Sequence, residues 1–334
     1  MSEILAHKWL RRFFAVVVLT AFVIWAVNLG SLLGFEGTGA TLIRIVGGFV
    51  VAVLLVVNAR AISRLPFRYQ VPVVWAELLI LFFGFFASFD LSYDFIGDRL
   101  PFLLGLRLNN GFFQGAAMTL FISLVSIACA STIALIAAYA RLSSSGLAFG
   151  IATFYVSFFR GTPLLLQVML IYLGLPQIGI VLDAIPAGII ALSLCYGAYL
   201  AEIFRAGILS IPRQQSEGAM ALGLTPFQTQ RLVILPQALR VIVPPTGNMF
   251  IAMLKDSALV SIMGVWELTY LAQTHGRSEF KYMEMLIAAA VIYWILSGIF
   301  EMVQSRIEKR LGRSHQVSTG SGPTRGQVWM GRTV

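Results

Sequence analysis

The chain has 334 residues, of which 58% are hydrophobic and only 12% are charged, and its mean hydropathy is +0.84. Soluble domains carry about 25% charged residues, so this sequence has too little polar surface to cover its apolar core in water. The net charge of +9 does not indicate nucleic-acid binding, because the basic residues lie between long apolar runs and do not form one stripe. We therefore expect an all-α, polytopic membrane protein.

The reactive side chains do not form a catalytic or metal-binding pattern. Cys129 and Cys195 both lie inside apolar runs, so we expect them to be buried small side chains and not a disulfide framework. His7, His275 and His315 are too far apart in the sequence to show metal-ligand spacing. No nucleophile–base pair or pair of acids stands out, so the sequence predicts neither catalysis nor a bound cofactor or metal.

Eight apolar runs have the length of a membrane-spanning helix, which needs about 20 residues. We predict spans at 13–33, 39–58, 71–89, 112–140, 148–173, 184–204, 245–264 and 283–304. The second run contains Arg44 and the seventh contains Lys255 and Asp256, so these two depart most from a purely apolar helix. The segment 205–243, between the sixth and seventh runs, is too polar to span.

The first run resembles the front of a signal peptide, because it follows Lys8, Arg11 and Arg12. It is longer than the 7–15 apolar residues of a signal peptide, and no small-x-small cleavage site follows it. We expect an uncleaved signal anchor.

The distribution of positive charge predicts the orientation in the membrane. With a cytoplasmic N-terminus, 18 of the 24 Lys and Arg residues fall in segments on the cytoplasmic side and four fall outside. The positive-inside rule therefore places both termini in the cytoplasm, which supports an even number of crossings. The tail 313–334, rich in Ser, Gly, Thr and Arg, is expected to be a disordered cytoplasmic end.

The cytoplasmic segment 210–236 predicts two short helices joined by a tight turn. Ser210 can cap the first helix, with Pro212 in its first turn, and Gly223 suits the left-handed position that ends it. Thr225 then begins the second helix, with Pro226 at its first position and Gln228 completing a capping box.

Two functions remain open for this helix pair when only its composition is considered. It can be an amphipathic connector on the membrane surface, or its small side chains can let another protein approach the backbone closely. A DNA-reading helix-turn-helix is not favoured, because the second helix has only Arg231 as a base-reading candidate and both ends continue into lipid.

The residues of this segment resemble the EAA loop of ABC importer permeases. The shared pattern is Glu217-Gly218-Ala219, then Gly223, then Val233-x-Leu235-Pro236. In that family the loop forms the coupling helix that docks in a groove of the ATPase subunit. The resemblance assigns coupling to Glu217, Gly218, Ala219, Leu222, Gly223, Thr225 and Pro226.

Flanking motifs are similar to those of the polar amino-acid permeases, which include histidine, glutamine, glutamate and arginine types. These motifs are FRGTPLLLQ at 159–167, AEIFRAG at 201–207, ILPQA at 234–238, PPTGN at 244–248 and KDSALVS at 255–261. The likeness covers about residues 109–310 and implies a permease domain at 109–312, preceded by an extension at 1–108 with three spans.

The sequence departs from the family pattern at two places. Gly218 replaces the usual first alanine of the loop, which weakens the helix by up to about 1 kcal/mol. Ser257-Ala258 stands where Thr-Ser is common.

Transport against a gradient requires an energy source outside this chain. A phosphate-binding P-loop needs Gly-Lys followed by Ser or Thr, and none of Lys8, Lys255, Lys281 and Lys309 has these neighbours. A separate ATPase holding ATP and magnesium is one alternative, and an ion gradient is the other. An ion-coupled carrier usually shows related halves and broken helices. We see no internal repeat, so the ATP-driven importer is favoured.

Charged residues within or beside the apolar runs are candidates for the translocation path. Lys255 and Asp256 each cost about 2.5–3.5 kcal/mol at mid-membrane and point about 100° apart, so we expect different partners. Pro244-Pro245 is expected to begin their helix, with Gly247 as a hinge. The candidate path or gate residues are Lys255, Asp256, Ser257, Arg160, Thr162 and Glu202.

Some of these residues have a structural alternative. Glu202 and Arg205 lie three apart on one helix face, and Arg160 is expected at a cytoplasmic helix start. They are equally suited to be structural ion pairs. The resemblance further implies a second permease subunit, two ATPase subunits, a solute-binding protein and a polar amino acid as partners.

Overall fold

The computed structural model describes residues 38–87, 91–106 and 114–312, and within them the chain forms helices and one isolated β-bridge. The predicted first span at 13–33 and the tail at 313–334 lie outside the described residues. The chain divides into two compact units between Asp90 and Leu91, and each unit is described by itself.

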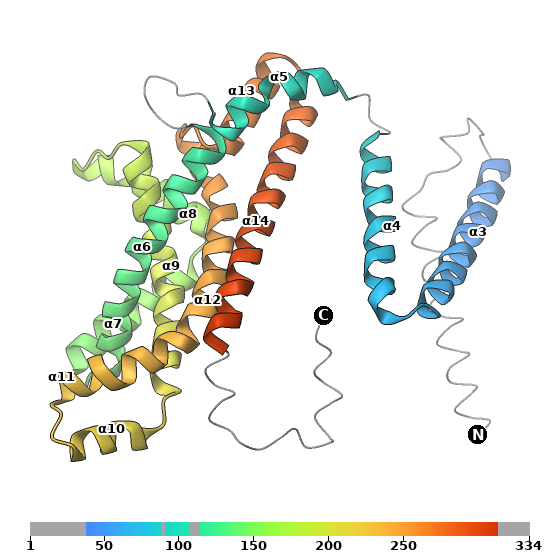
Figure 1. Cartoon of the computed structure of the whole chain (residues 1–334). Helices are drawn as coiled ribbons and strands as arrows, with labels where there is room; N and C mark the ends of the chain where they lie inside the picture. The colour runs from blue at the N-terminus through green and yellow to red at the C-terminus, as the bar shows by residue number, and fades with distance from the viewer. Residues whose placement is uncertain (1–37, 88–90, 107–113, 313–334) are drawn as a thin grey trace. The chain divides into compact units, whose positions relative to one another are not determined.

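The first unit contains a helical hairpin of α3 (Thr38–Ser63) and α4 (Phe67–Ala87), shown in Figure 1. Its side chains are largely exposed and apolar, as expected for helices that face lipid. Asn58 Nδ2 donates a hydrogen bond to Glu77 Oε2 at 2.8 Å, which joins the two helices. The carboxylate inside the third predicted span therefore has a polar partner, as such groups need in lipid.

The second unit carries the remaining helices, joined by short π- and 3-10 segments (Figure 1). In chain order they are α5 (Tyr93–Leu104), α6 (Gly115–Leu142), α7 (Gly146–Gly161), α8 (Leu164–Met169), η1 (Leu170–Gly174), η2 (Leu175–Ile178), α9 (Ala184–Leu209), α10 (Arg213–Ala221), α11 (Pro226–Gln228), η3 (Thr229–Ile234), α12 (Leu235–Asp256), η4 (Ser257–Met263), α13 (Leu268–Ser278) and α14 (Tyr282–Gly312).

The core of this unit forms where α6 and α9 pack together. Small side chains let two membrane helices approach closely. The resulting van der Waals contacts stabilise the pair, because the hydrophobic effect does not drive helix association in lipid. Both helices bury alanines along the shared face: Ala130, Ala134, Ala137 and Ala138 on α6, and Ala187, Ala191, Ala198 and Ala201 on α9. Cys195 is buried as predicted, whereas Cys129 is exposed on α6, so its predicted burial was wrong.

Five of the described helices are long and apolar enough to cross a membrane, or six if a bent pair counts as one span. The predicted number of eight is not confirmed. The bent pair replaces the continuous span expected at 148–173, since the stretches Gly146–Gly161 and Leu164–Ile178 are bent by 108° relative to each other. Pro163 lacks an N–H and disfavours helical geometry at Thr162, which is extended with φ −113° and ψ 145°.

The prediction for the seventh span was also wrong. Its helix, α12, begins at Leu235, keeps Pro244 and Pro245 inside, and ends at Asp256, with η4 following. The proline pair therefore lies within a helix and does not begin one. Among the described helices α12 is not one of the candidate spans, because charged residues and prolines interrupt its apolar character.

Candidate functional site

The predicted coupling loop folds as two short helices, with one difference at the start. Pro212 occupies the N-cap of α10, whereas the predicted cap, Ser210, ends α9 and donates its hydroxyl to the Gly207 carbonyl at 2.7 Å. Gly223 has φ +85° and ends α10, as predicted. Its N–H donates to Met220 O at 2.9 Å and that of Leu224 to Ala219 O at 3.2 Å, which satisfies the last carbonyls of α10.

The second helix of the loop has the predicted capping box. Thr225 Oγ1 accepts from Gln228 N at 3.3 Å, and Gln228 Oε1 accepts from Thr225 N at 2.9 Å, with Pro226 at the first helical position. From α11 the chain passes without a loop through η3 into α12. Helical backbone therefore continues from the loop to the Lys255-Asp256 end of α12.

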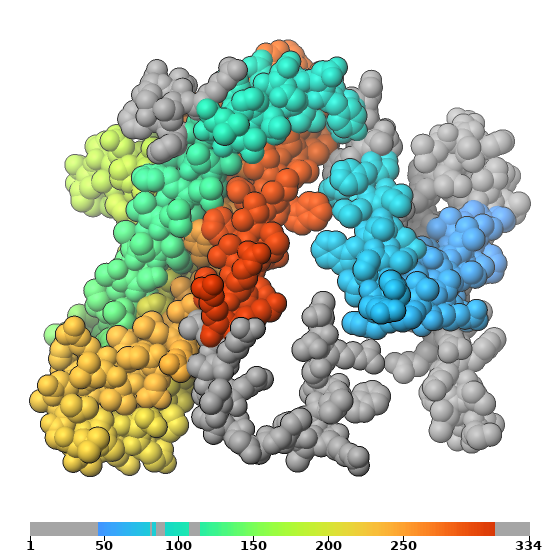
Figure 2. Space-filling view, in the orientation of Figure 1, coloured from blue at the N-terminus to red at the C-terminus, as the bar shows by residue number. Residues whose placement is uncertain are grey.

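The loop exposes apolar side chains at one end of the second unit, in the lobe visible in Figure 2. The exposed fractions are 85% for Leu222, 71% for Phe227 and 49% for Met220. Glu217 is exposed beside them and forms no hydrogen bond or ion pair within the described residues, whereas Ala219 is buried against the loop itself. Exposed apolar groups with polar neighbours are typical of a protein-docking surface.

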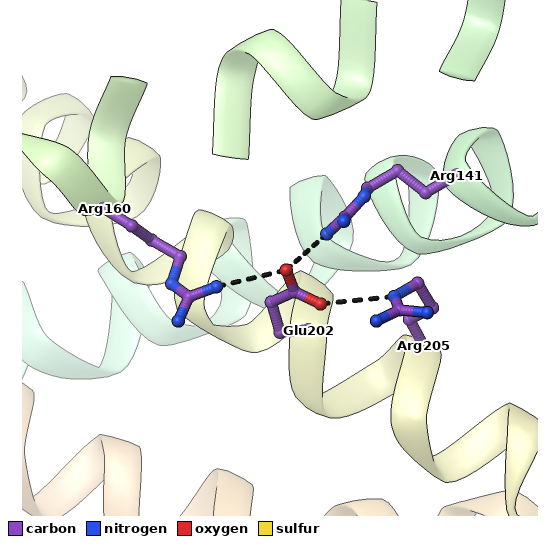
Figure 3. A network of polar contacts seen from close by, with 4 residues as sticks. All are labelled: Arg141, Arg160, Glu202 and Arg205. Carbon is purple, nitrogen blue, oxygen red and sulfur yellow. Dashed lines mark hydrogen bonds and ion pairs between the residues drawn. The ribbon is translucent and has the colours of Figure 1, made fainter. Parts of the chain in front are cut away.

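Glu202 on α9 joins three arginines from three helices (Figure 3). Its Oε1 lies 2.5 Å from Arg141 Nη1 and 3.1 Å from Arg160 Nη1, and its Oε2 lies 3.2 Å from Arg205 Nε. Arg160 lies in the last turn of α7, so its predicted place at a helix start was wrong. One carboxylate therefore fastens the ends of α6 and α7 to α9.

A buried glutamine closes the break between α7 and α8. Gln167 is 3% exposed, and its Nε2 donates to Phe159 O at 2.8 Å, Thr162 O at 3.0 Å and Thr162 Oγ1 at 2.9 Å. An amide has two hydrogens, so these acceptors share them. The side chain supplies donors that the carbonyls at the end of α7 lack, and Thr162 is held within the structure of the bend.

Lys255 and Asp256 are the last two residues of α12, and both are exposed. Asp256 Oδ2 accepts a hydrogen bond from Tyr196 Oη on α9 at 2.7 Å, although the aspartate remains exposed. The Lys255 ammonium has no hydrogen bond or ion pair within the part of the chain that the structure describes. Ser257 is fully buried and donates to Leu254 O at 2.8 Å, so it does not face an open path.

The family of the chain follows from a match over residues 130–313 to binding-protein-dependent transport system inner membrane components. That range is more than half of the chain. The chain belongs to this family. Its members are transport components, and the ion-gradient alternative receives no support.

Curated relatives match this transport component over nearly their whole length. The probable amino-acid ABC transporter permease protein YckA of Bacillus subtilis is 40% identical over 197 residues, which are 59% of this chain and 87% of the relative. The glutamine transport system permease protein GlnP of Escherichia coli is 38% identical, covering 59% and 91%. The arginine transport system permease protein ArtQ of Bacillus subtilis is 36% identical, covering 66% and 98%.

Two solved structures resemble the fold of this transport component. The crystal structure of an amino acid ABC transporter with histidines has 39% sequence identity and a TM-score of 0.55, covering 58% of this chain and 91% of that chain. An inward-facing MetNI methionine ABC transporter has a TM-score of 0.51 at 22% identity and supports the fold alone.

Sequence reasoning missed three side chains that the family fold brings into the site. Arg141 and Tyr196 lie 61 and 60 residues from their partners Glu202 and Asp256. Gln167 lies within the FRGTPLLLQ motif, but its contacts depend on the bend between α7 and α8, which the sequence did not predict. The available signals were the charge of Arg141, directly after the predicted span at 112–140, and the hydroxyl of Tyr196 inside the predicted span at 184–204.

The transport component also buries a carboxylate outside its spans. Glu267 caps α13, accepts from Thr269 N at 2.8 Å and from Tyr270 N at 2.6 Å, and is 0% exposed. Tyr293 Oη donates to the same group at 2.9 Å. Burial raises the pKa of the Glu267 carboxyl to about 7, although these hydrogen bonds act to lower it.

This pKa predicts that stability falls as pH rises from about 4.5 to about 7. In that range the folded protein binds the proton more tightly than the unfolded chain, so the loss reaches about 3 kcal/mol. We expect Glu267→Gln to flatten the profile, measured as thermal unfolding in detergent between pH 5 and 8. A profile of the variant as steep as that of the wild type would assign the pH dependence to other groups.

Proposed function

We propose that the chain is the permease subunit of an ATP-binding-cassette importer for polar amino acids. The observation that carries this proposal is the exposed loop of α10 and α11, which continues as helix into α12. The names of similar proteins support the substrate class, since GlnP and ArtQ are glutamine and arginine permeases. The permease domain is 109–312, with a membrane extension at 1–108.

The proposed assembly places ATP and magnesium on partner subunits. An ATPase docks against Glu217 to Pro226, where apolar side chains are exposed beside an unpaired carboxylate within the described residues. A second permease subunit completes the path, and a solute-binding protein delivers the amino acid from the other side of the inner membrane. ATP-driven closure changes the populations of two permease states by binding them with different affinity.

The orientation proposed for the chain places the loop and both termini in the cytoplasm. Arg141, Arg160 and Arg205 meet at one carboxylate close to the loop end of α9. A surplus of arginine at one end of a membrane domain is typical of its cytoplasmic side.

The translocation path is proposed to run along α9 and α12. Lys255 and Asp256 offer opposite charges to the ammonium and carboxylate of an amino acid, and Ser257 holds the helix end that presents them. Arg160, Thr162 and Glu202 form the cytoplasmic gate, because Arg160 joins the end of α7 to Glu202 on α9 and Thr162 lies in the adjoining bend.

Reconstitution tests this function directly. The chain, its ATPase and its binding protein are placed in proteoliposomes and supplied with a panel of labelled amino acids. We expect uptake of at least one polar amino acid that requires ATP and the binding protein. Uptake without the ATPase, or no uptake of any amino acid by the assembled complex, would contradict the proposal.

A single hydroxyl tests the path. We expect Tyr196→Phe to lower the uptake rate about tenfold, because the exposed Asp256 loses its donor on α9. Tyr155→Phe is a matched control, since Tyr155 Oη makes a bond of the same length, 2.7 Å, to the Leu194 carbonyl on α9. Equal loss of uptake in both variants, at equal amounts of complex, would assign Tyr196 a structural role only.

A further inference from the structure

The helix that leaves the coupling loop is weakened at one place. Pro244 and Pro245 have no N–H, so neither position donates the usual helical bond to the carbonyl four residues earlier. The Thr246 hydroxyl donates to Ile242 O at 2.8 Å, which gives the next carbonyl an additional donor. A helix with two adjacent missing bonds bends more easily than its neighbours, and α12 carries this weakness between the loop and Asp256.

Gln304 of α14 lies directly against this weak point. It is 9% exposed, and its Nε2 lies 3.0 Å from Pro244 O, 2.8 Å from Asn248 Oδ1 and 3.0 Å from Glu308 Oε1. The Pro244 carbonyl and a carboxylate can only accept, so the amide must present its NH₂ group to them. Two hydrogens serve three acceptors, two of them on α12 and one on α14 itself.

The backbone of α12 is shaped to receive this side chain. A Cβ on Gly247 would lie 2.8 Å from Gln304 Cδ and Oε1, closer than real Cβ contacts, so glycine leaves the room that the amide occupies. The buried Gln304 Oε1 has no partner within the described residues. A buried amide oxygen without a partner destabilises the fold, unless the hydrogen bonds from the same amide to α12 offset that cost.

A cavity beside the same contact gives α12 space to move. It has a volume of about 260 Å³, and its lining includes Ile127 of α6, Val243 and Phe250 of α12, and Phe300 and Val303 of α14. It is partly open to the outside of the chain, and it adjoins the weakened turn. Its apolar lining lets side chains of α12 enter without loss of hydrogen bonds.

We propose that Gln304 is a positioning residue for the ATP-driven movement of α12. It acts as a latch, by which we mean a side chain that holds the proline turn of α12 in either of two arrangements. In one arrangement its hydrogens serve Pro244 O and Asn248, and in the other one hydrogen passes to Glu308 while α12 bends into the cavity. The inference rests on the proposed function, because it concerns how motion of the loop reaches the path. Both arrangements keep two hydrogen bonds, so the change between them does not require a buried donor to lose its acceptor.

The experiment measures amino acid moved per ATP hydrolysed in proteoliposomes that contain the complete complex. Gln304→Met keeps the length of the side chain and removes all its hydrogen bonds, and we expect this ratio to fall about tenfold while basal ATP hydrolysis persists. Asn248→Ala, which removes one acceptor from the α12 side, is expected to lower the ratio in the same direction. The exchange Asn248→Gln with Gln304→Asn preserves the pair of amides and is expected to restore part of the ratio.

A matched control lies on the same helix. Ser297 is 7% exposed and its hydroxyl has no partner within the described residues, so Ser297→Ala removes a buried polar group away from the proline turn. An unchanged ratio in Gln304→Met, or an equal fall in Ser297→Ala, would overturn the latch while leaving the importer intact. If Gln304→Met fails to assemble, Asn248→Ala decides in the same way. Absence of ATP-dependent uptake by the wild type would instead overturn the proposed function, and the latch with it.

Discussion

Replacing Gly223 with proline is expected to abolish ATP-driven uptake while the protein still reaches the membrane. Gly223 has φ +85°, and its N–H donates to Met220 O at 2.9 Å. Proline fixes φ near −65° and has no N–H, so it can satisfy neither requirement. The turn between α10 and α11 must then open, and Leu222 and Phe227 no longer share one docking surface.

A matched substitution separates backbone geometry from the loss of glycine itself. Asparagine tolerates the left-handed region, and no atom lies within 4 Å of a Cβ at Gly223. We therefore expect Gly223→Asn to keep most of the uptake. The measurements are uptake in proteoliposomes, the amount of protein in the membrane, and co-purification of the ATPase. Undiminished uptake in Gly223→Pro would refute the coupling role of the loop.

The docking surface can be tested without disturbing the turn. Phe227 is 71% exposed, so Phe227→Asp removes little packing within the chain and places a charge in the proposed apolar interface. Ala219 is buried, and a bulky residue there displaces α10 itself. If the interface is the cause, Phe227→Asp releases the ATPase from the complex without lowering the thermal stability of the permease.

Local sequence signals predicted local structure well in this chain. The capping box at Thr225 and the left-handed Gly223 were predicted because both depend on residues no more than five positions apart. The predicted spans at 39–58, 71–89, 112–140, 184–204 and 283–304 overlap described helices for the same reason, since twenty apolar residues in series determine their own hydrogen bonding.

The effect of proline on a helix differed from the prediction in opposite directions at two places, and side-chain contacts differ between them. At Thr162-Pro163 the chain bends by 108°, and Gln167 supplies donors to the carbonyls left open. At Pro244-Pro245 the helix continues, and Thr246 and the amide of Gln304 add donors to the carbonyls of Ile242 and Pro244 beside the turn that the prolines weaken. The residues that decide between a bend and a continuous helix lie on other turns or other helices, so local sequence could not distinguish the two cases.

Charge partners were the least predictable part of the candidate site. The sequence showed the pair Glu202 and Arg205, three positions apart, but Arg141 lies on α6 and contacts the same carboxylate. Its place depends on the alanine-rich packing of α6 against α9, which sets the two helix ends side by side. The site therefore follows from a tertiary contact that sequence spacing does not contain.

Removal of the shared carboxylate tests that arrangement, and we expect Glu202→Ala to lower the free energy of unfolding by about 3 kcal/mol. The side chain of Glu202 is 26% exposed, that of Arg141 is 14% exposed and that of Arg160 is 42% exposed. Without the carboxylate, three guanidinium groups repel one another at the ends of α6, α7 and α9. The most buried guanidinium loses the most, because water compensates it least.

The ranking of the arginines is the sharper test. We expect Arg141→Ala to cost about 2 kcal/mol and Arg160→Ala less than about 1 kcal/mol, since exposed ion pairs contribute little. Glu202→Gln keeps an acceptor and loses the charge, so its loss should lie between those of Glu202→Ala and the wild type. Thermal unfolding of the purified complex in detergent measures all four variants. Equal losses for Arg141→Ala and Arg160→Ala would show that burial does not set the strength of this network, and the gate would then depend on charge alone.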